Sequence, residues 1–462
     1  MTIRRLLCAA LACLALAVLS LLLADEPVYD AWSWLVWGRE LTHLELDTTS
    51  GPAWKPLPVL LTAPLSLAGD AAPHLWLVFV RASWAVALVL AAQISLTLSA
   101  GRPRAARFAG AAFAVAGIVL LRDDVTHWSR QVAGGVAEPL LVALVLGAAA
   151  AGLAGRARSA LALGALAALA RPEVFALLAL YALWAWRAAP RARPLAVAVA
   201  LAVPALWLAP ELLLADGGAS PAQRARTDTG DPLEALGWAA LLPLAVAWPL
   251  ALAALHDRRA QVLGAGALGL VAIVAAMTVA GFAGLPRFMA PAAALVGVLG
   301  GAGLAALLAR PRAWIVALAV PALAVTAIGL PGRVGQVPHA WRSAARISDS
   351  HDRLRDVVAA VGRERLLACG RLATSDVLVR TALAWKLGVP LSEVVSFGTR
   401  PRLSGAFVVG LQASPGLRRD VRAGATRVAA GGEWSVYSID CPATASSSPG
   451  PARSVGVSGT TR

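Results

Sequence analysis

Apolar runs long enough to cross a membrane as helices alternate with short polar segments along most of the chain. A helix of about 20 apolar residues spans the roughly 30 Å of bilayer hydrocarbon. The runs cover residues 6–24, 73–99, 106–121, 136–154, 159–170, 173–187, 195–213, 236–255, 261–282, 288–309 and 313–330. Hydrophobic residues make up 58% of the 462 residues and charged residues 15%. This pattern predicts an all-α polytopic membrane protein with about eleven transmembrane helices.

Two of these runs need separate interpretation. The first follows Arg4-Arg5 and resembles a cleavable signal peptide, but it is long and no small-x-small site precedes Asp25, so we expect a retained first span. The fifth and sixth runs are short and are interrupted at Arg171-Pro172-Glu173. They are expected to form a hairpin whose limbs do not each cross the bilayer fully.

The polar segments differ in charge on the two predicted sides of the membrane. One side holds fourteen arginines and a single acid, Asp257, whereas most of the other loop acids fall on the opposite side. The arginines are Arg4, Arg5, Arg102, Arg104, Arg107, Arg156, Arg158, Arg187, Arg191, Arg193, Arg258, Arg259, Arg310 and Arg312. Because positive loops stay in the cytoplasm, the N-terminus is predicted to be cytoplasmic and the residues after about 332 extracytoplasmic, in the plasma membrane. The net charge of +15 is therefore a topology signal, and nucleic acid is not an expected partner.

Residues 335–441 change in character and predict a small extracytoplasmic α/β domain after a membrane domain of residues 1–334. Strand-like runs occur at 365–369, 393–397 and 434–438, with helical patterns near 349–362 and 375–388. Residues 442–462 are rich in Ser, Pro, Gly and Thr and are expected to be disordered. Cys369 and Cys441 could form a disulfide in this exported segment, and two free thiols are equally consistent with the sequence.

The first predicted outer loop, residues 25–72, concentrates acidic and aromatic residues. Trp32, Trp34 and Trp37 are typical of a helix lying in the membrane interface. Acidic residues precede these tryptophans at the outer end of the first span, where a carboxylate meets both water and headgroups.

Four motifs in this order resemble the C-type superfamily of multi-spanning glycosyltransferases. They are Asp25-Glu26-x-x-Tyr29; Trp54-Lys55-Pro56-Leu57-Pro58 with Gly69 and Arg81; Ala170-Arg171-Pro172-Glu173; and Leu285-Pro286-Arg287-Phe288-Met289-Ala290-Pro291. The superfamily uses polyprenyl-phosphate sugars and includes protein O-mannosyltransferases, lipid A aminoarabinose transferases and actinobacterial mannosyl- and arabinofuranosyltransferases. The resemblance covers roughly residues 1–330, and the family's Lys-Pro-Pro is replaced here by Lys-Pro-Leu-Pro.

The resemblance implies an inverting transfer of a sugar, mannose or a pentose, to a glycan, lipid or protein acceptor at the outer face. It implies a carboxylate base, for which Asp25 is the first candidate and Glu26 and Asp30 are alternatives. Donor-phosphate binding would fall to three cations, Lys55, Arg171 and Arg287. Further contacts to substrate are expected from Tyr29, Glu138 and His127. No metal site and no cofactor are expected.

Each of these residues also has a purely structural interpretation. Asp25 could be a solvated helix end, Lys55 and Arg287 could snorkel to headgroups, and Arg171 could pair with Glu173. Glu138 could be a favourable charge at a helix N-terminus. A transporter or lipid flippase, or a non-catalytic envelope scaffold, are the alternative functions, although transporters tend to carry ionisable groups at the bilayer midplane.

Overall fold

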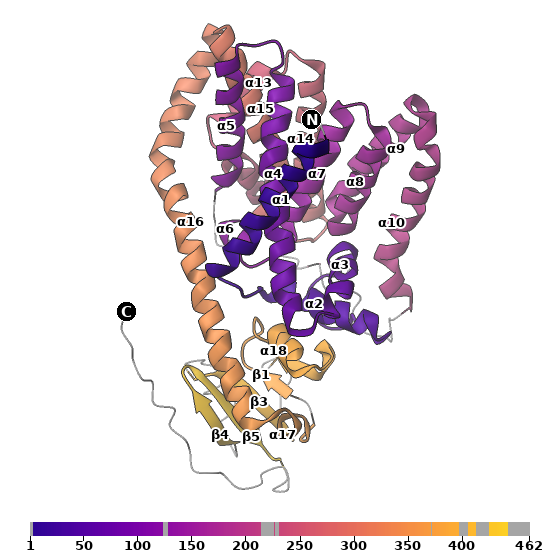
Figure 1. The fold of residues 1–462 in the computed structure, drawn as a ribbon, viewed down its shortest axis with the longest axis vertical. Coiled ribbons are helices and arrows are strands. Elements are labelled where there is room, and N and C mark those ends of the chain that lie inside the picture. Colours follow the sequence, from indigo (N-terminus) through magenta and orange to yellow (C-terminus); the bar gives the residue numbers. More distant parts are fainter. Residues whose placement is uncertain are drawn as a thin grey trace. The chain divides into compact units, whose positions relative to one another are not determined.

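The computed structural model describes residues 3–122, 128–213, 226, 231–370, 372–396, 405–412 and 425–441. The chain divides into two compact units, Met1–Arg346 and Ile347–Arg462. The first is built of helices, and the second contains a small sheet (Figure 1). The predicted class, a helical membrane protein with a small C-terminal α/β domain, is confirmed at this level. His127 and the predicted tail 442–462 lie outside the described residues.

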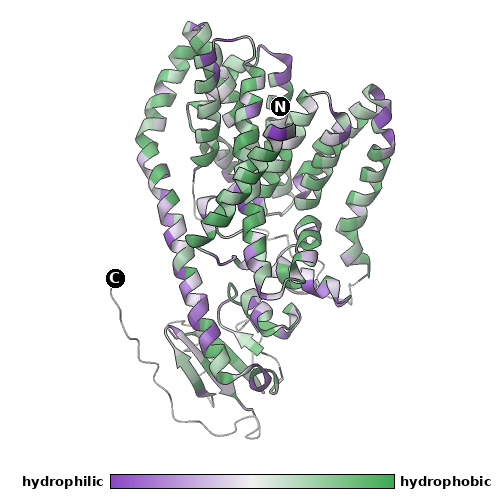
Figure 2. Cartoon of the chain, viewed as in Figure 1, coloured by the Kyte–Doolittle hydropathy of each residue, from purple (hydrophilic) through white to green (hydrophobic). Residues whose placement is uncertain are grey.

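Helices occur within every predicted run. Their bounds are α1 Ile3–Leu19, α2 Tyr29–Thr42, α3 Pro56–Ser66, α4 Ala72–Leu98, α5 Arg104–Val119, α6 Trp128–Ala133, α7 Glu138–Leu153, α8 Ala157–Ala170, α9 Phe175–Ala188, α10 Arg193–Leu213, α12 Pro232–Leu241, α13 Ala247–Ala254, α14 Arg258–Val279, α15 Ala290–Ala309 and α16 Ala313–Val361. Short 3₁₀ turns precede some of them: η3 (Pro172–Val174) before α9, η4 (Pro190–Ala192) before α10 and η5 (Pro286–Met289) before α15. Figure 2 shows hydrophobic residues along these helices and hydrophilic residues gathered at many of their ends.

Five helical stretches of the described chain are long and apolar enough to cross a membrane. They are Gly69–Leu98, Pro190–Pro210, Arg258–Val279, Pro286–Ala309 and Ala313–Val361, and shorter apolar helices accompany them. The protein is therefore a multi-pass membrane protein, while the count of eleven spans stays a prediction.

Two predicted spans have different shapes in the structure. The run 236–255 is not one helix, because α12 ends before Pro243 and α13 begins at Ala247. Leu242, before the proline, keeps helical angles (φ −59°, ψ −52°), but Pro243 has no backbone N–H and its ring crowds the preceding turn, so the helix does not continue. The guanidinium of Arg333 donates to the carbonyls of Leu241, Leu242 and Pro243 at 2.8–3.0 Å. These hydrogen bonds satisfy carbonyl groups that the end of α12 leaves without a helical partner. The last run, 313–330, belongs to α16, which continues through the predicted domain boundary at 334/335 as far as Val361.

The core of the first unit surrounds α15, which packs against α4, α5, α7, α13 and α14. Glycines permit the closest approaches: a Cβ on Gly303 would lie 1.7 Å from the Leu250 carbonyl oxygen of α13, and one on Gly301 would lie 2.2 Å from that of Gly110 on α5. Small residues at helix interfaces let the backbones meet closely within a membrane. In Figure 1, α9 and α10 lie at one edge of this unit.

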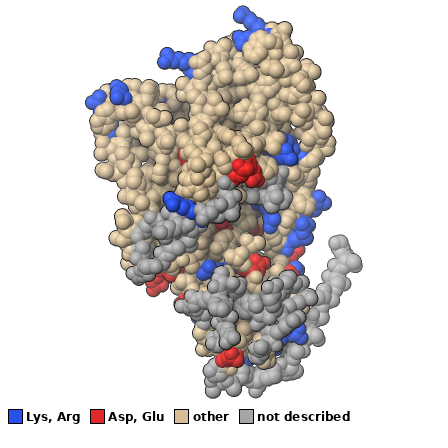
Figure 3. Space-filling view, turned by 180° about the vertical axis from the view of Figure 1, so that it is seen from behind, with Lys and Arg blue, Asp and Glu red and all other residues tan. Residues whose placement is uncertain are grey.

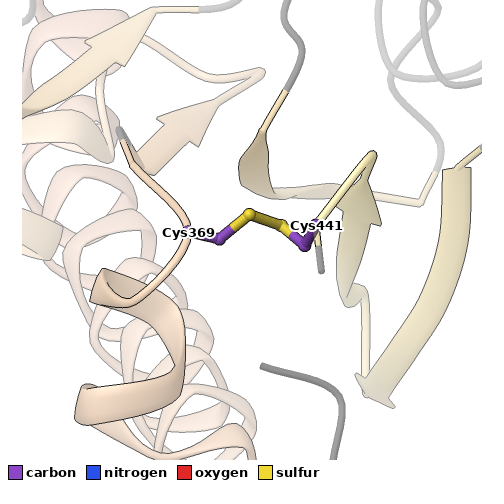
Figure 4. The surroundings of a disulfide bond; sticks show 2 residues. All are labelled: Cys369 and Cys441. Atoms are coloured by element: carbon purple, nitrogen blue, oxygen red, sulfur yellow. A yellow bond between two sulfur atoms is a disulfide. The ribbon is translucent and has the colours of Figure 1, made fainter. Parts of the chain in front are cut away.

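The second unit holds a five-stranded sheet in the order β2-β1-β3-β5-β4. The strands are β1 Leu372–Thr374, β2 Val394–Ser396, β3 Ala406–Leu411, β4 Ala425–Gly431 and β5 Trp434–Ile439, with helices α17 Arg363–Leu367 and α18 Arg380–Leu387. β1 is parallel to β2 and β3, whereas β5 is antiparallel to β3 and β4. A disulfide joins Cys369 to Cys441, which resolves the alternative that the sequence left open (Figure 4).

One strand prediction in this unit is wrong. Residues 365–369 were expected to be extended, but 363–367 form α17, and the strand begins at Leu372. Leu366 lies in α17 and is fully buried. The short apolar run therefore packs into the core as a helix. Short runs of this kind do not distinguish a helix from a strand.

Candidate active site

The acidic residues after α1 point into different surroundings. Asp25 is half exposed, and its Oδ2 lies 3.4 Å from Nε2 of His74. Glu26 is buried and accepts a hydrogen bond from the Trp32 indole at 3.1 Å. Asp30 lies in the first turn of α2, and its Oδ2 lies 3.5 Å from Nη1 of Arg287 and 3.8 Å from Nζ of Lys55. Asp30 is therefore in contact with two of the predicted phosphate-binding cations.

Glu138, the first residue of α7, is the centre of the charged site. Its side chain is fully buried. Its Oε1 lies 3.9 Å from Lys55 Nζ, 3.7 Å from Arg171 Nη1 and 3.8 Å from Arg287 Nε. The structure thus brings together all three cations that the sequence assigned to donor phosphate, around a carboxylate assigned only to substrate contact.

A further acid completes the group. Glu173 Oε1 lies 3.5 Å from Arg171 Nη2, as the structural interpretation of Arg171 predicted. We use the name charge cluster for these six residues: Asp30, Lys55, Glu138, Arg171, Glu173 and Arg287. Three cations and three carboxylates make it formally neutral.

Prolines set the backbone at the cations of the charge cluster. Lys55 precedes Pro56, the first residue of α3, and has φ −140° and ψ 108°. Arg171 precedes Pro172 and has φ −153° and ψ 128°. A residue before proline is pushed from the helical to the extended region, so both cations lie at breaks between helices. Arg287 follows Pro286 in η5, which is again a break before a long helix.

The ion pairs of the charge cluster are long and poorly supplied with hydrogen bonds. Charge-assisted hydrogen bonds are usually about 2.7–2.9 Å long, whereas these contacts are 3.5–3.9 Å. Among the described residues, Lys55 Nζ, both carboxylate oxygens of Glu138, and Nε and Nη2 of Arg171 are buried with no hydrogen-bond partner. Burial lowers the pKa of Lys55, and the charge of Glu138 opposes this shift. The cluster therefore has unused hydrogen-bonding capacity.

Aromatic rings line the charge cluster. The ring of Trp34 lies 4.9 Å from Lys55 Nζ, and the ring of Phe288 lies 3.6 Å from the guanidinium carbon of Arg171. Such contacts favour a cation without adding an anion. Trp34 and Phe288 were not proposed from the sequence as site residues, because nothing in the pattern distinguished them from other aromatics.

The tryptophans of α2 do not lie exposed to lipid, as an interface helix would place them. Trp32, Trp34 and Trp37 are at most 3% exposed. Trp34 packs edge-on against Trp76 at 5.8 Å, and Trp37 packs against Trp54. These three rings therefore contact protein, where contacts with lipid headgroups were expected. Tyr29, predicted to contact substrate, begins α2 and is partly buried.

Arg81 supports the loops around the site, although the sequence analysis named it only as part of a motif. It lies in α4 and is 4% exposed. Its Nη2 donates to the carbonyls of Ala24 and Ala133, and its Nη1 donates to that of Ser20 at 3.1 Å. Arg81 therefore ties the start of the acidic loop to the segment that leads into α7. A lone charge inside an apolar run was the signal that could have identified it.

Within the described ranges, no group of three or more His, Cys, Asp or Glu side chains could hold a metal ion. In the charge cluster each cation lies within 4 Å of a carboxylate. Cations of this kind can stabilise an anion, and a carboxylate can take up a proton.

Comparison with solved structures identifies the fold. The chain is similar to ArnT from Cupriavidus metallidurans bound to undecaprenyl phosphate, with 14% identity and a TM-score of 0.54. The apo state of the same protein gives 15% identity and a TM-score of 0.56. Both alignments cover 95% of this chain and 98% of ArnT. At these identities the likeness shows the fold: the chain has the fold of ArnT, in agreement with the fold that the resemblance to C-type glycosyltransferases implied.

The other two comparisons gave no relative. No protein-family model matches the chain, and no curated protein matches it.

Proposed function

We propose that this protein is an integral membrane glycosyltransferase that moves a sugar from a polyprenyl-phosphate donor to an acceptor at the outer membrane face. The observation that carries the proposal is the convergence of Lys55, Arg171 and Arg287 on one buried carboxylate, Glu138, from three distant parts of the chain. The similarity in fold to ArnT, whose structure holds undecaprenyl phosphate, supports a polyprenyl-phosphate donor here.

The three cations bind the donor phosphate in this proposal. Lys55 and Arg171 are buried, and Nζ of Lys55 and Nε and Nη2 of Arg171 have no hydrogen-bond partner among the described residues, which favours an anion with several acceptor oxygens. As the bond between the anomeric carbon and the phosphate oxygen breaks, the electron pair stays on the phosphate. Cations already held in position stabilise that developing charge, so the leaving group needs no general acid.

Asp30 is the base in this proposal. The acceptor hydroxyl oxygen attacks the anomeric carbon while Asp30 takes its proton, and one direct displacement inverts the configuration. One observation favours Asp30 over Asp25: it contacts Arg287 and Lys55, two of the cations proposed to hold the donor phosphate. Its side chain is 16% exposed, so that an acceptor can approach it. Asp25 contacts His74 and is 46% exposed, and Glu26 is occupied by the Trp32 indole.

The donor sugar is proposed to be mannose or a pentose, and the acceptor a glycan, lipid or protein hydroxyl. The residues of the charge cluster lie at helix ends and loops that the loop charges predict to be extracytoplasmic. A lipid-borne donor can reach such a position from within the bilayer.

The test uses membranes containing the full chain, with radiolabelled polyprenyl-phospho-mannose and polyprenyl-phospho-arabinofuranose as donors. Transfer of label and release of polyprenyl phosphate are followed for wild type, Asp30→Asn and the matched variant Asp25→Asn. General-base catalysis contributes about 10²–10⁴-fold, so Asp30→Asn should lower kcat by that factor with donor KM little changed. Asp25→Asn should retain most activity.

Two results would overturn parts of this proposal. Loss of activity in Asp25→Asn with retention in Asp30→Asn would move the base to Asp25. Transfer that is indifferent to both substitutions, or no transfer from any polyprenyl-phosphate sugar with well-folded protein, would contradict the reaction itself.

A further inference from the structure

A second basic site lies at the other end of α8 from the charge cluster. A cavity of about 480 Å³ opens between the turn that joins α7 to α8 and the turn that joins α9 to α10. Its lining includes Arg156, Arg158, Ser159, Pro190 and Arg191. We call it the arginine cavity. The 14 residues of α8 separate it from Arg171 by about 20 Å, so it is distinct from the proposed active site.

The charges that line the arginine cavity are all positive. No acidic residue lines it, and no ion pair involves Arg156, Arg158 or Arg191 within the described part of the chain. The helix N-termini of α8 and α10, at Ala157 and Arg193, lie beside it and add partial positive charge. On the face seen in Figure 3, the charged side chains visible at the upper end of the molecule are basic. An anion is therefore the ligand that this cavity suits.

The helix surface next to the arginine cavity is apolar and aromatic. Trp184 and Trp186, in the last turns of α9, are 52% and 44% exposed, and Leu183 and Leu201 are also exposed. The guanidinium of Arg193 lies 5.5 Å from the ring of Trp186. Exposed tryptophans beside arginines at helix ends are typical of the level where headgroups meet acyl chains. A ligand with a phosphate and apolar chains would use both surfaces, whereas free phosphate would use only the first.

We propose that the arginine cavity binds the headgroup of an anionic phospholipid of the cytoplasmic leaflet, with its acyl chains along α9 and α10. Basic pockets between transmembrane helices on the cytoplasmic side are suited to such headgroups. The side follows from the predicted topology, in which both turns are cytoplasmic. The lipid would clamp two helical hairpins together at the ends opposite the charge cluster.

The experiment counts bound lipid on the purified full-length protein by native mass spectrometry during titration with phosphatidylglycerol, with phosphatidylcholine as the zwitterionic comparison. The test variant carries Arg156→Gln, Arg158→Gln and Arg191→Gln. The control carries Arg258→Gln, Arg259→Gln and Arg312→Gln, which removes equal charge from the same predicted side without touching the cavity. The test variant should lose one tight phosphatidylglycerol and bind it at least about tenfold more weakly, while the control stays within about twofold of wild type.

A charge-preserving variant, Arg156→Lys with Arg158→Lys and Arg191→Lys, should retain lipid and thereby separate binding from folding. Equal losses in the test and control variants would contradict a defined site and indicate diffuse attraction. Equal protection of the protein against thermal unfolding by inorganic phosphate and by phosphatidylglycerol would overturn the lipid assignment in favour of a soluble anion. Equal binding of phosphatidylcholine would remove the anionic requirement altogether.

Discussion

Two groups of charged side chains in this protein differ in how completely their polar atoms are hydrogen-bonded. In the second unit, Glu433 accepts from Nε and Nη2 of Arg353 at 2.7 and 2.8 Å and also from the hydroxyl of Ser350. Ser350 in turn accepts from the Trp434 indole through its carbonyl at 2.8 Å. This group is short, bidentate and saturated, as expected of a structural brace.

The charge cluster of the first unit is the opposite case. Its contacts are 3.5–3.9 Å long, its charges are more deeply buried, and several of its atoms have no hydrogen bond among the described residues. Buried polar groups in native proteins are usually satisfied, and exceptions call for an explanation such as a catalytic role. The contrast favours the proposal that the charge cluster receives an anionic ligand.

The largest expected effect comes from removing the anion at the centre of the charge cluster. Glu138→Gln leaves buried cations without their shared partner, and breaking a buried pair costs about 3–5 kcal/mol. We expect a lower unfolding temperature in detergent, and a larger rescue by added undecaprenyl phosphate than in wild type, because phosphate replaces the lost charge. The exposed Glu234→Gln serves as control. An unchanged unfolding temperature, or equal rescue in both proteins, would count against the account.

Neutralising a phosphate-binding cation should come next. Loss of one preorganised group that stabilises developing charge costs about 10²–10³ in rate, so Lys55→Gln should lower kcat/KM for the donor by that factor. The chain has one other lysine, Lys386 in α18, and Lys386→Gln is the matched control. Steady-state transfer assays with varied donor measure both. Similar activity in the two variants would remove Lys55 from the site.

A smaller effect is expected from loosening the support of the charge cluster. Arg81→Lys keeps the charge but cannot reach the carbonyls of Ser20, Ala24 and Ala133 together, and each charged hydrogen bond lost costs about 1.5–3 kcal/mol of stability. As a positioning residue, Arg81 should affect kcat more than donor KM. Steady-state kinetics and the unfolding temperature of the variant are both measured. A loss of stability with unchanged kcat would show that Arg81 is a purely structural residue.

The smallest effect is expected at the ion pair of Glu433 with Arg353 in the second unit. The hydrogen bond from Arg353 lowers the pKa of Glu433 to about 2 in the folded chain, below the value of about 4.3 expected when unfolded. This stabilisation is present above about pH 4.3 and is lost as the pH falls towards 2. Wild type and Glu433→Gln should therefore differ in thermal stability at pH 6 and converge near pH 2. A difference that persists at pH 2 would contradict the ion-pair explanation.

Sequence reasoning found most of the charge cluster but not its arrangement. Lys55, Arg171 and Arg287 were selected together because each stands in a motif at a predicted outer position. The sequence favoured Asp25 over Asp30 as the base. The two lie five residues apart in one loop, and only the start of α2 at Tyr29 turns Asp30 towards the cations. The central position of Glu138 depends on packing of segments distant in sequence, which no local pattern records.

For the helices, too, the sequence predicted the positions better than the detailed structure. Hydrophobic runs predicted their positions well, because burial in lipid and core follows composition. The last apolar run ends near residue 330, yet α16 continues through Pro331 and Pro338. Local propensity is a weak guide where tertiary context supports the helix.

The central claim, that the charge cluster receives the donor phosphate, is tested most directly by binding. Purified protein is titrated with undecaprenyl phosphate, and the change in its ³¹P resonance gives the affinity for wild type, Lys55→Gln, Arg287→Gln and Lys386→Gln. The account predicts weakening of about tenfold or more in the first two variants and wild-type affinity in Lys386→Gln. Unchanged affinity in Lys55→Gln and Arg287→Gln would contradict it.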